Sequence, residues 1–135
     1  MKRQLTAHKT NQANDAIDIE VLDQPGDGGA PHLYRLSGFN TATNRSDPFV
    51  ERHGGPATYS TVLFQNGPIP DQGVNGVTHE ALLAILIDRL EHFQRGPFAC
   101  RENALALTKL QEALHWLDHR TRGRLARGVE GTHTL

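Results

Sequence analysis

Cysteine, long apolar runs and net charge are all scarce in this sequence. Cys100 is the single cysteine, which excludes an internal disulfide framework and suits a reducing cytosol. The longest apolar run, ALLAILI, is too short to span a bilayer, and the N-terminal MKRQLTAHKTNQAN lacks any apolar run. A formal net charge of -1 provides no strong field for wrapping a nucleic-acid polymer. We therefore expect a soluble, cytoplasmic protein that binds neither membranes nor DNA or RNA polymers.

The chain length predicts one domain. A chain of 135 residues can bury one modest core, and its 13 glycines and 7 prolines indicate many loops. We expect a single domain over residues 1–135 whose parts follow one another along the chain. These parts are an N-terminal arm (1–14), a β-rich portion (15–77), a helical hairpin (78–127) and a C-terminal tail (128–135).

Three segments of the β-rich portion have the composition of strands. Residues 16–22 (AIDIEVL) alternate apolar and acidic side chains, which is the period of a strand with one dry face. Residues 32–39 (HLYRLSGF) supply a return strand after the turn QPGDGGAPH. Residues 58–65 (TYSTVLFQ) are β-branched and aromatic, and residues 40–57 between them have the composition of a surface loop. These patterns predict an antiparallel sheet of about three or more strands.

Two apolar stripes at helical spacing follow the predicted sheet. Gly96-Pro97 separates them and favours a turn, while Thr78 is the expected cap of the first helix. The fold class is therefore α+β, with a small N-terminal antiparallel β-sheet followed by a long antiparallel helical hairpin. The stripe of the first helix comprises Leu82, Leu83, Leu86, Ile87, Leu90 and Phe93, and that of the second comprises Ala106, Leu107, Leu110, Ala113, Leu114 and Leu117.

The glycine-rich turn QPGDGGAPH invites comparison with phosphate-binding loops. It contains neither the dinucleotide fingerprint nor the Walker pattern, and it joins a strand to a strand with no helix N-terminus to receive a phosphate. A hairpin turn explains these residues without a ligand. A phosphate role for the turn remains the alternative.

His115 and His119 lie one helical turn apart, a spacing that metalloprotease helices use to bind zinc. The glutamate that such helices use as general base is absent, and a third ligand would have to come from His92 or His79. A metal-dependent nucleotide hydrolase is therefore one hypothesis. The other interpretation is a pair of solvated, hydrogen-bonding histidines.

Four arginines, Arg120, Arg122, Arg124 and Arg127, gather at the end of the second helix. Cations at a helix C-terminus complement the helix dipole, which is one interpretation. The absence of lysine from this stretch favours the other, bidentate recognition of a phosphate by guanidinium groups. Both interpretations predict that these side chains are exposed.

Two residues near the predicted hairpin turn each have two interpretations, of which the sequence alone favours the structural one. Phe93 is either a core residue at the end of its stripe or a stacking platform for a nucleobase. Asn103 is either a cap of the second helix or a reader of a base edge. Trp116 faces a different side and is interpreted as a subunit contact. No Ser/His/Asp or Cys/His arrangement has a recognisable local context.

Several longer segments of the sequence resemble those of a known family. They are FQNGP, GVNGVT, FQRGPFACRENALALTKLQEALHWL and RGVEGTH. They look like the phage-encoded Thoeris anti-defence protein one family, whose helical hairpin is similar to that of anti-CBASS protein two. The resemblance covers residues 61–133 closely, and the head IEVLDQPGDGGAPHLYRLSGF also resembles the strand portion of the family.

The resemblance implies a sponge and not an enzyme. Members of the family bind cyclic ADP-ribose isomers, such as glycocyclic ADP-ribose, made by bacterial TIR-domain proteins, and they hold the signal intact in the host cytoplasm. Some assemble as trimers of dimers and bind the cyclic di- or trinucleotides of CBASS at separate sites. The implied partners are cyclic nucleotides and further copies of the chain, and no cofactor is implied. A non-catalytic accessory protein whose hairpin only mediates oligomerisation is a further hypothesis.

The resemblance also implies roles for individual residues. Phe93 is expected to stack on adenine, Asn103 to hydrogen-bond the ligand, and Arg120 and Arg124 to hold its phosphates. This site is expected to be shared across a two-fold interface, because one hairpin presents a face and not a cavity. The separate cyclic-oligonucleotide site is expected at the backbone amides of Gly28, Gly29 and Ala30.

Overall fold

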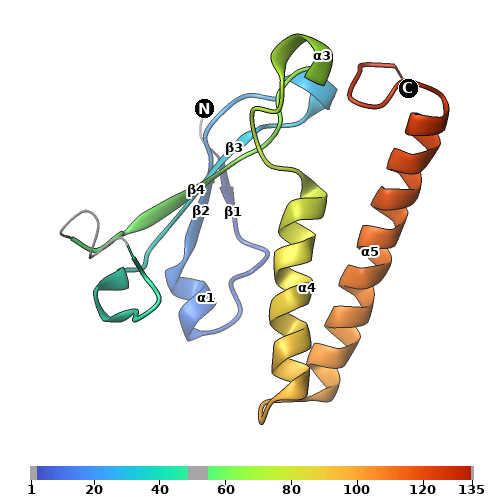
Figure 1. Ribbon diagram of the computed structural model, residues 1–135. Coiled ribbons are helices and arrows are strands. Elements are labelled where there is room, and N and C mark those ends of the chain that lie inside the picture. The colour runs from blue at the N-terminus through green and yellow to red at the C-terminus, as the bar shows by residue number, and fades with distance from the viewer. Residues whose placement is uncertain (1–2, 49–54, 135) are drawn as a thin grey trace. The chain divides into compact units, whose positions relative to one another are not determined.

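The computed structural model describes residues 3–48 and 55–134, which divide into two compact units (Figure 1). The first unit ends at Asn66 and the second begins at Gly67. The boundary between the units lies before residue 78, where the predicted hairpin begins. It lies there because the segment after Gly67 belongs with the hairpin: the amide of Ile69 donates to the carbonyl of Gly131 over 2.8 Å.

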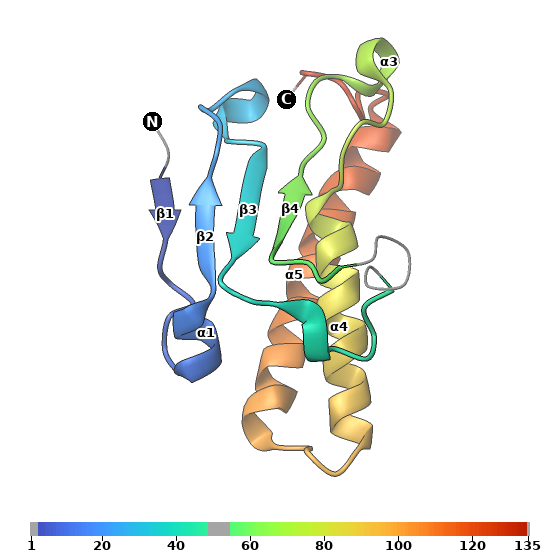
Figure 2. The same ribbon diagram turned by 90° about the vertical axis from the view of Figure 1, so that its left-hand side faces the viewer.

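The first unit is a four-stranded antiparallel sheet with the order β1-β2-β3-β4 (Figure 2). Its strands are β1 (Arg3–Leu5), β2 (Asp18–Val21), β3 (Leu33–Ser37) and β4 (Tyr59–Leu63). The three strands predicted from the sequence are confirmed. The loop predicted over residues 40–57 contains a short 3-10 turn at Thr41–Thr43, and residues 49–54 lie outside the described residues.

The described part of the predicted N-terminal arm contains regular structure, which corrects that prediction. β1 pairs with β2 through the partners Arg3 with Val21 and Leu5 with Ile19. The helix α1 (Gln12–Ala16) follows, and the side chain of Asn11 caps it by accepting from the amide of Asn14. A strand of three residues is too short to show a period in the sequence, which is why pattern analysis misses it.

The register of the sheet separates a mainly apolar face from a face with a polar central row. Residues paired across neighbouring strands share a face, and successive rows alternate between faces. Val21, the buried residue of the sheet, belongs to the apolar rows, and Arg35 belongs to the polar rows, where its guanidinium lies 4.8 Å from the ring centre of Tyr59. Apart from Arg3 and Ser60 on the outer strands, the apolar rows consist of Leu5, Ile19, Val21, Tyr34, Leu36 and Val62, and the central polar row consists of Gln4, Glu20, Arg35 and Thr61.

The second unit contains the antiparallel helical hairpin predicted from the sequence, formed by α4 (His79–Arg95) and α5 (Arg101–Ala126) (Figure 1). Thr78 caps α4 as expected, accepting from the amide of Ala81 over 3.1 Å, and Gly96 ends that helix. The connection before α4 contains a short helix that was not predicted, α3 (Ile69–Gln72). None of the described helices combines the length and apolarity that a bilayer crossing requires.

The hairpin leaves many of its large apolar side chains in contact with solvent. Ile87 is its one buried hydrophobic residue among those described, whereas Leu86 of the predicted stripe is 47% exposed. A helix pair buries only the stripe along its contact line, so apolar residues beyond that line remain uncovered. The exposed ones on α4 and α5 are Ile85, Leu86, Phe93, Leu105, Trp116 and Leu125.

Candidate functional site

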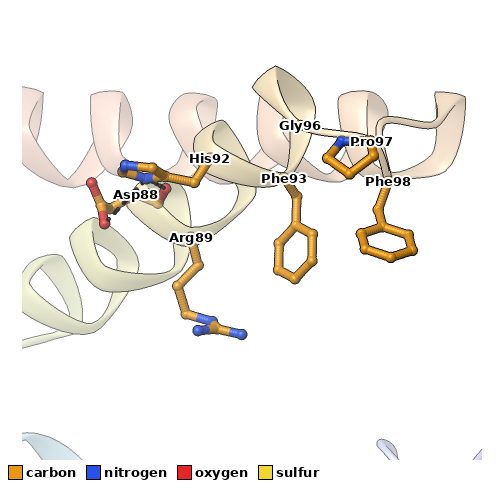
Figure 3. A pocket seen from close by; sticks show the side chains of 7 residues that line it. All are labelled: Asp88, Arg89, His92, Phe93, Gly96, Pro97 and Phe98. Atoms are coloured by element: carbon orange, nitrogen blue, oxygen red, sulfur yellow. Dashed lines mark hydrogen bonds and ion pairs between the residues drawn. The ribbon is translucent and has the colours of Figure 1, made fainter. Parts of the chain in front are cut away.

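A hollow of about 440 Å³ lies at the turn of the hairpin (Figure 3). Its volume falls within the range of small-molecule sites, ~300–1,000 Å³. The last turns of α4 contribute Asp88, Arg89, His92 and Phe93, and the turn itself contributes Gly96, Pro97 and Phe98. Arg89, Phe93 and Phe98 project in the same direction, with Phe93 between the other two (Figure 3).

Phe93 lines this hollow and is 39% exposed, so the core interpretation of its ring is wrong. The guanidinium carbon of Arg89 lies 5.7 Å from the centre of the Phe93 ring, which is cation–π distance. Arg89 was not singled out in the sequence, although it lies one helical turn before Phe93 and therefore on the same face. An aromatic ring beside a guanidinium is suited to a planar, anionic ligand.

Asn103 lies in the first turn of α5. It does not cap that helix, contrary to one interpretation of the sequence. The N-cap is Cys100, whose Sγ accepts from the amide of Asn103 over 3.4 Å. The side-chain amide of Asn103 makes no hydrogen bond within the part of the chain that the structure describes. Its donor and acceptor are therefore available to a ligand or a partner.

Two hydrogen bonds close the turn between the helices. The side chain of Gln94 donates from Nε2 to the carbonyl of Cys100 and accepts at Oε1 from the amide of Cys100, each over 3.1 Å. The side-chain amide thus pairs with both backbone polar groups of one residue, as a neighbouring strand would. The residues enclosed by this clamp, Arg95 to Ala99, include the hollow's Phe98.

A second hollow, of about 410 Å³, lies near the end of α5. Its lining consists of His119, Arg120, Gly123, Arg124 and Arg127. Arg120 is exposed and forms no hydrogen bond or ion pair with any of the residues described. Its guanidinium is therefore available to an anion, as the phosphate interpretation requires.

Arg124 departs from the expectation that all four arginines are exposed. It is only 7% exposed, and its Nε lies 3.1 Å from Oε2 of Glu130. Its two terminal nitrogens donate to backbone carbonyls of the C-terminal segment, those of Val129, Thr132 and Thr134. The sequence shows only that Arg124 is an arginine near a helix end, whereas its burial depends on how the tail folds back.

The two hollows are far apart within one hairpin. Asn103 and Arg120 both lie on α5, where a rise of ~1.5 Å per residue separates them by about 25 Å along the axis. A single cyclic ADP-ribose isomer is much shorter than this distance. The residues that the resemblance groups into one site therefore come together only if two copies of the chain contribute.

The glycine-rich turn joins β2 to β3 as predicted, and its residues Asp27–Gly29 form a short 3-10 segment that is kinked at Gly28. Gly28 and Gly29 have φ angles of 78° and 80°, which glycine adopts readily. The amide of Gly29 donates to the carbonyl of Gly26 over 2.9 Å, so it is already used within the turn. The amides of Gly28 and Ala30 form no hydrogen bond with described residues.

Asp23 connects the two ends of this turn by hydrogen bonds. One carboxylate oxygen accepts from the amides of His32 and Leu33, and the other accepts from His32, all over 3.0 Å. The hydrogen bond from Leu33 is the main cause that lowers the pKa of Asp23, and the His32 amide and ring act in the same direction. The carboxylate thus fixes the start of β3 relative to β2.

His115 and His119 lie with their ring centres 6.5 Å apart, and Trp116 packs edge-on against both. Within residues 3–48 and 55–134, no group of three or more His, Cys, Asp or Glu side chains converges where it could hold a metal ion. The third ligand that the hydrolase hypothesis requires therefore does not come from His92 or His79. Trp116 itself is 65% exposed.

Comparison with known proteins finds a family and a phage relative that are similar to part of this chain. The family model described as "Acb2/Tad1, hairpin domain" matches residues 58–122. A relative named "Thoeris anti-defense 1", from Bacillus phage SBSphiJ7, is 58% identical over 74 residues, which cover 55% of this chain and 52% of the relative. The chain thus spans about half the length of the relative it matches. From β4 through most of α5, the chain is similar to the Acb2/Tad1 hairpin family.

Proposed function

We propose that this chain is a phage anti-defence protein that binds a cyclic ADP-ribose isomer, such as glycocyclic ADP-ribose, and keeps it from its effector without cleaving it. The observation that carries the proposal is the hollow at the hairpin turn, where Phe93 is exposed beside Arg89. The ring offers a stacking surface to adenine, and the guanidinium offers a charge to a phosphate. The relative's name, which refers to anti-defence against Thoeris, supports the anti-defence part of the proposal.

The complete site in this proposal belongs to a homodimer. If two hairpins pair about a two-fold axis with their α5 helices antiparallel, the turn of one copy lies near the α5 end of the other. Phe93 and Asn103 of one copy would then face Arg120 of its partner, across the distance that a single hairpin cannot close. The apolar side chains left exposed on α4 and α5 would supply the buried surface that such a dimer needs.

Arg124 has a different part in this site from the one first expected. Its guanidinium is engaged by Glu130 and the tail, so a ligand phosphate must replace some of these contacts or approach Arg120 first. We therefore assign the main phosphate contact to Arg120, with Arg124 as a second contact. Sequestration requires slow release, and several polar contacts around one stacked base favour it.

The proposal extends to two further properties. The amides of Gly28 and Ala30 are candidates for binding cyclic di- or trinucleotides of CBASS at a separate site, and Gly29 contributes by shaping the turn. Trimers of such dimers would bring several of these turns together. The protein would act in the cytoplasm of the infected bacterial host, where both kinds of signal are made.

The test is recovery of an unchanged nucleotide. The protein is incubated with the product of a TIR-domain enzyme, freed from unbound nucleotide, and denatured. Chromatography with mass spectrometry should then return the cyclic isomer intact and in stoichiometric amount. Recovery of a hydrolysed product would favour a nucleotide hydrolase, and recovery of no nucleotide would favour an accessory protein that only oligomerises.

A further inference from the structure

Phe98 is the most exposed aromatic residue of the hairpin turn. Its side chain is 74% exposed, and it lines the same hollow as Phe93. A single exposed apolar residue is common on protein surfaces and needs no explanation by itself. The position of Phe98 is unusual because its ring lies on the side of Phe93 opposite Arg89 (Figure 3).

The turn that carries Phe98 is held at both ends. The side chain of Gln94 pairs with the backbone amide and the carbonyl of Cys100 through two hydrogen bonds of 3.1 Å. Inside this clamp, the amide of Gly96 donates to the carbonyl of Phe93 over 3.2 Å, and Pro97 has a φ angle fixed by its ring. A ring on a braced turn loses less conformational entropy on binding than a ring on a loose loop.

We propose that Phe98 is a second stacking ring for the nucleobase of the ligand and that Gln94 is the residue that positions it. This inference rests on the proposed function and deepens it. A planar base that enters the hollow between Phe93 and Phe98 is contacted by both rings, while Arg89 lies on the side of Phe93 away from Phe98. The turn therefore selects ligands that carry a base over phosphorylated sugars that lack one.

The test measures affinity by calorimetry with glycocyclic ADP-ribose as the probe. Phe98→Ala should weaken binding about ten- to hundredfold, the range for loss of one base-stacking ring. Phe98→Tyr should stay within a few-fold of the unmodified protein, because its ring is retained. Val74→Ala is the matched control, since Val74 is 79% exposed in the same unit but does not line the hollow, and it should bind normally.

Different outcomes distinguish this inference from the proposed function. Unchanged affinity in Phe98→Ala, together with lost affinity in Phe93→Ala, overturns the second ring and leaves the proposed function intact. No binding by the unmodified protein overturns the proposed function and the inference with it. A lower mass of Phe98→Ala by light scattering would make Phe98 a subunit contact and would also overturn the inference.

The role of Gln94 is tested by a double-mutant cycle. Gln94→Met keeps a similar volume but removes both hydrogen bonds to Cys100. It should weaken binding several-fold in the unmodified protein and have little effect in the Phe98→Ala background, because the clamp acts through that ring. Equal effects in both backgrounds would refute positioning. Unchanged far-UV circular dichroism confirms that the helices remain.

Discussion

The Nε of Arg124 lies 3.1 Å from a carboxylate oxygen of Glu130, and this ion pair joins the end of α5 to the segment that follows it. The same guanidinium donates to carbonyls of that segment, so one side chain organises residues 129–134. The amide of Ile69 in α3 then donates to Gly131. Arg124 therefore links the end of the hairpin to the segment that precedes it.

Arg124→Ala should lower the free energy of unfolding by roughly 2–4 kcal/mol, because it removes several charge-assisted hydrogen bonds from a buried group. The loss is below that of a fully buried pair, since Glu130 is partly exposed and can be solvated. Urea denaturation gives the measurement. Arg122→Ala is the control: its ion pair with Asp118 is exposed, so the change should be under ~0.5 kcal/mol. Equal stability of the two variants would contradict the structural role of Arg124.

Acid should weaken the first unit through Asp23. Its pKa is lowered in the folded chain, so the unfolded state binds a proton more readily, and the stability that Asp23 contributes is fully present above its ordinary pKa. That contribution is lost as the pH falls below about 4. We expect the midpoint of thermal unfolding to fall over this range. In Asp23→Asn the acid-induced fall should be shallower, and an unchanged pH profile would contradict the role of the carboxylate.

Two glycine-to-alanine changes should act in opposite directions. Gly38 has a φ of 90°, and a Cβ there would overlap the carbonyl of Ala16, so Gly38→Ala should destabilise by more than ~1 kcal/mol. Gly123 lies within α5 with open space around it, so Gly123→Ala should stabilise by roughly 0.5–1 kcal/mol through helix propensity. Thermal unfolding of both variants is the measurement. The same sign for both would contradict the local geometry.

Sequence patterns predict those parts of this molecule that depend on local periodicity. The alternation in β2 and the stripes of α4 and α5 are local signals, and Thr78 is a local cap, so all were predictable. β1 has only three residues, and its pairing with β2 depends on contacts distant in the chain. The burial of Arg124 likewise depends on the tail, and the hollow at Phe93 on a turn closed by Gln94. Such features arise from tertiary contacts that single-sequence patterns do not encode.

A mixing experiment tests whether the ligand site is shared between two copies. Arg120→Ala should weaken binding by roughly 1.5–3 kcal/mol, the range for a hydrogen bond to a charged group, without loss of stability, because Arg120 is exposed. Phe93→Ala should also bind poorly. If Phe93 and Arg120 of different copies form each site, a mixed dimer of the two variants contains one intact site and one doubly altered site.

Refolding the two variants together should therefore restore binding that neither has alone. With random pairing, half of the dimers are mixed and each has one intact site, so about a quarter of the normal number of sites should return at normal affinity. Calorimetry measures that number, and refolding each variant by itself is the control. A site built within one chain predicts no recovery at all, because every chain in the mixture carries one alteration. Absence of high-affinity sites in a mixture shown to contain mixed dimers would therefore place Phe93 and Arg120 in separate or intrachain roles.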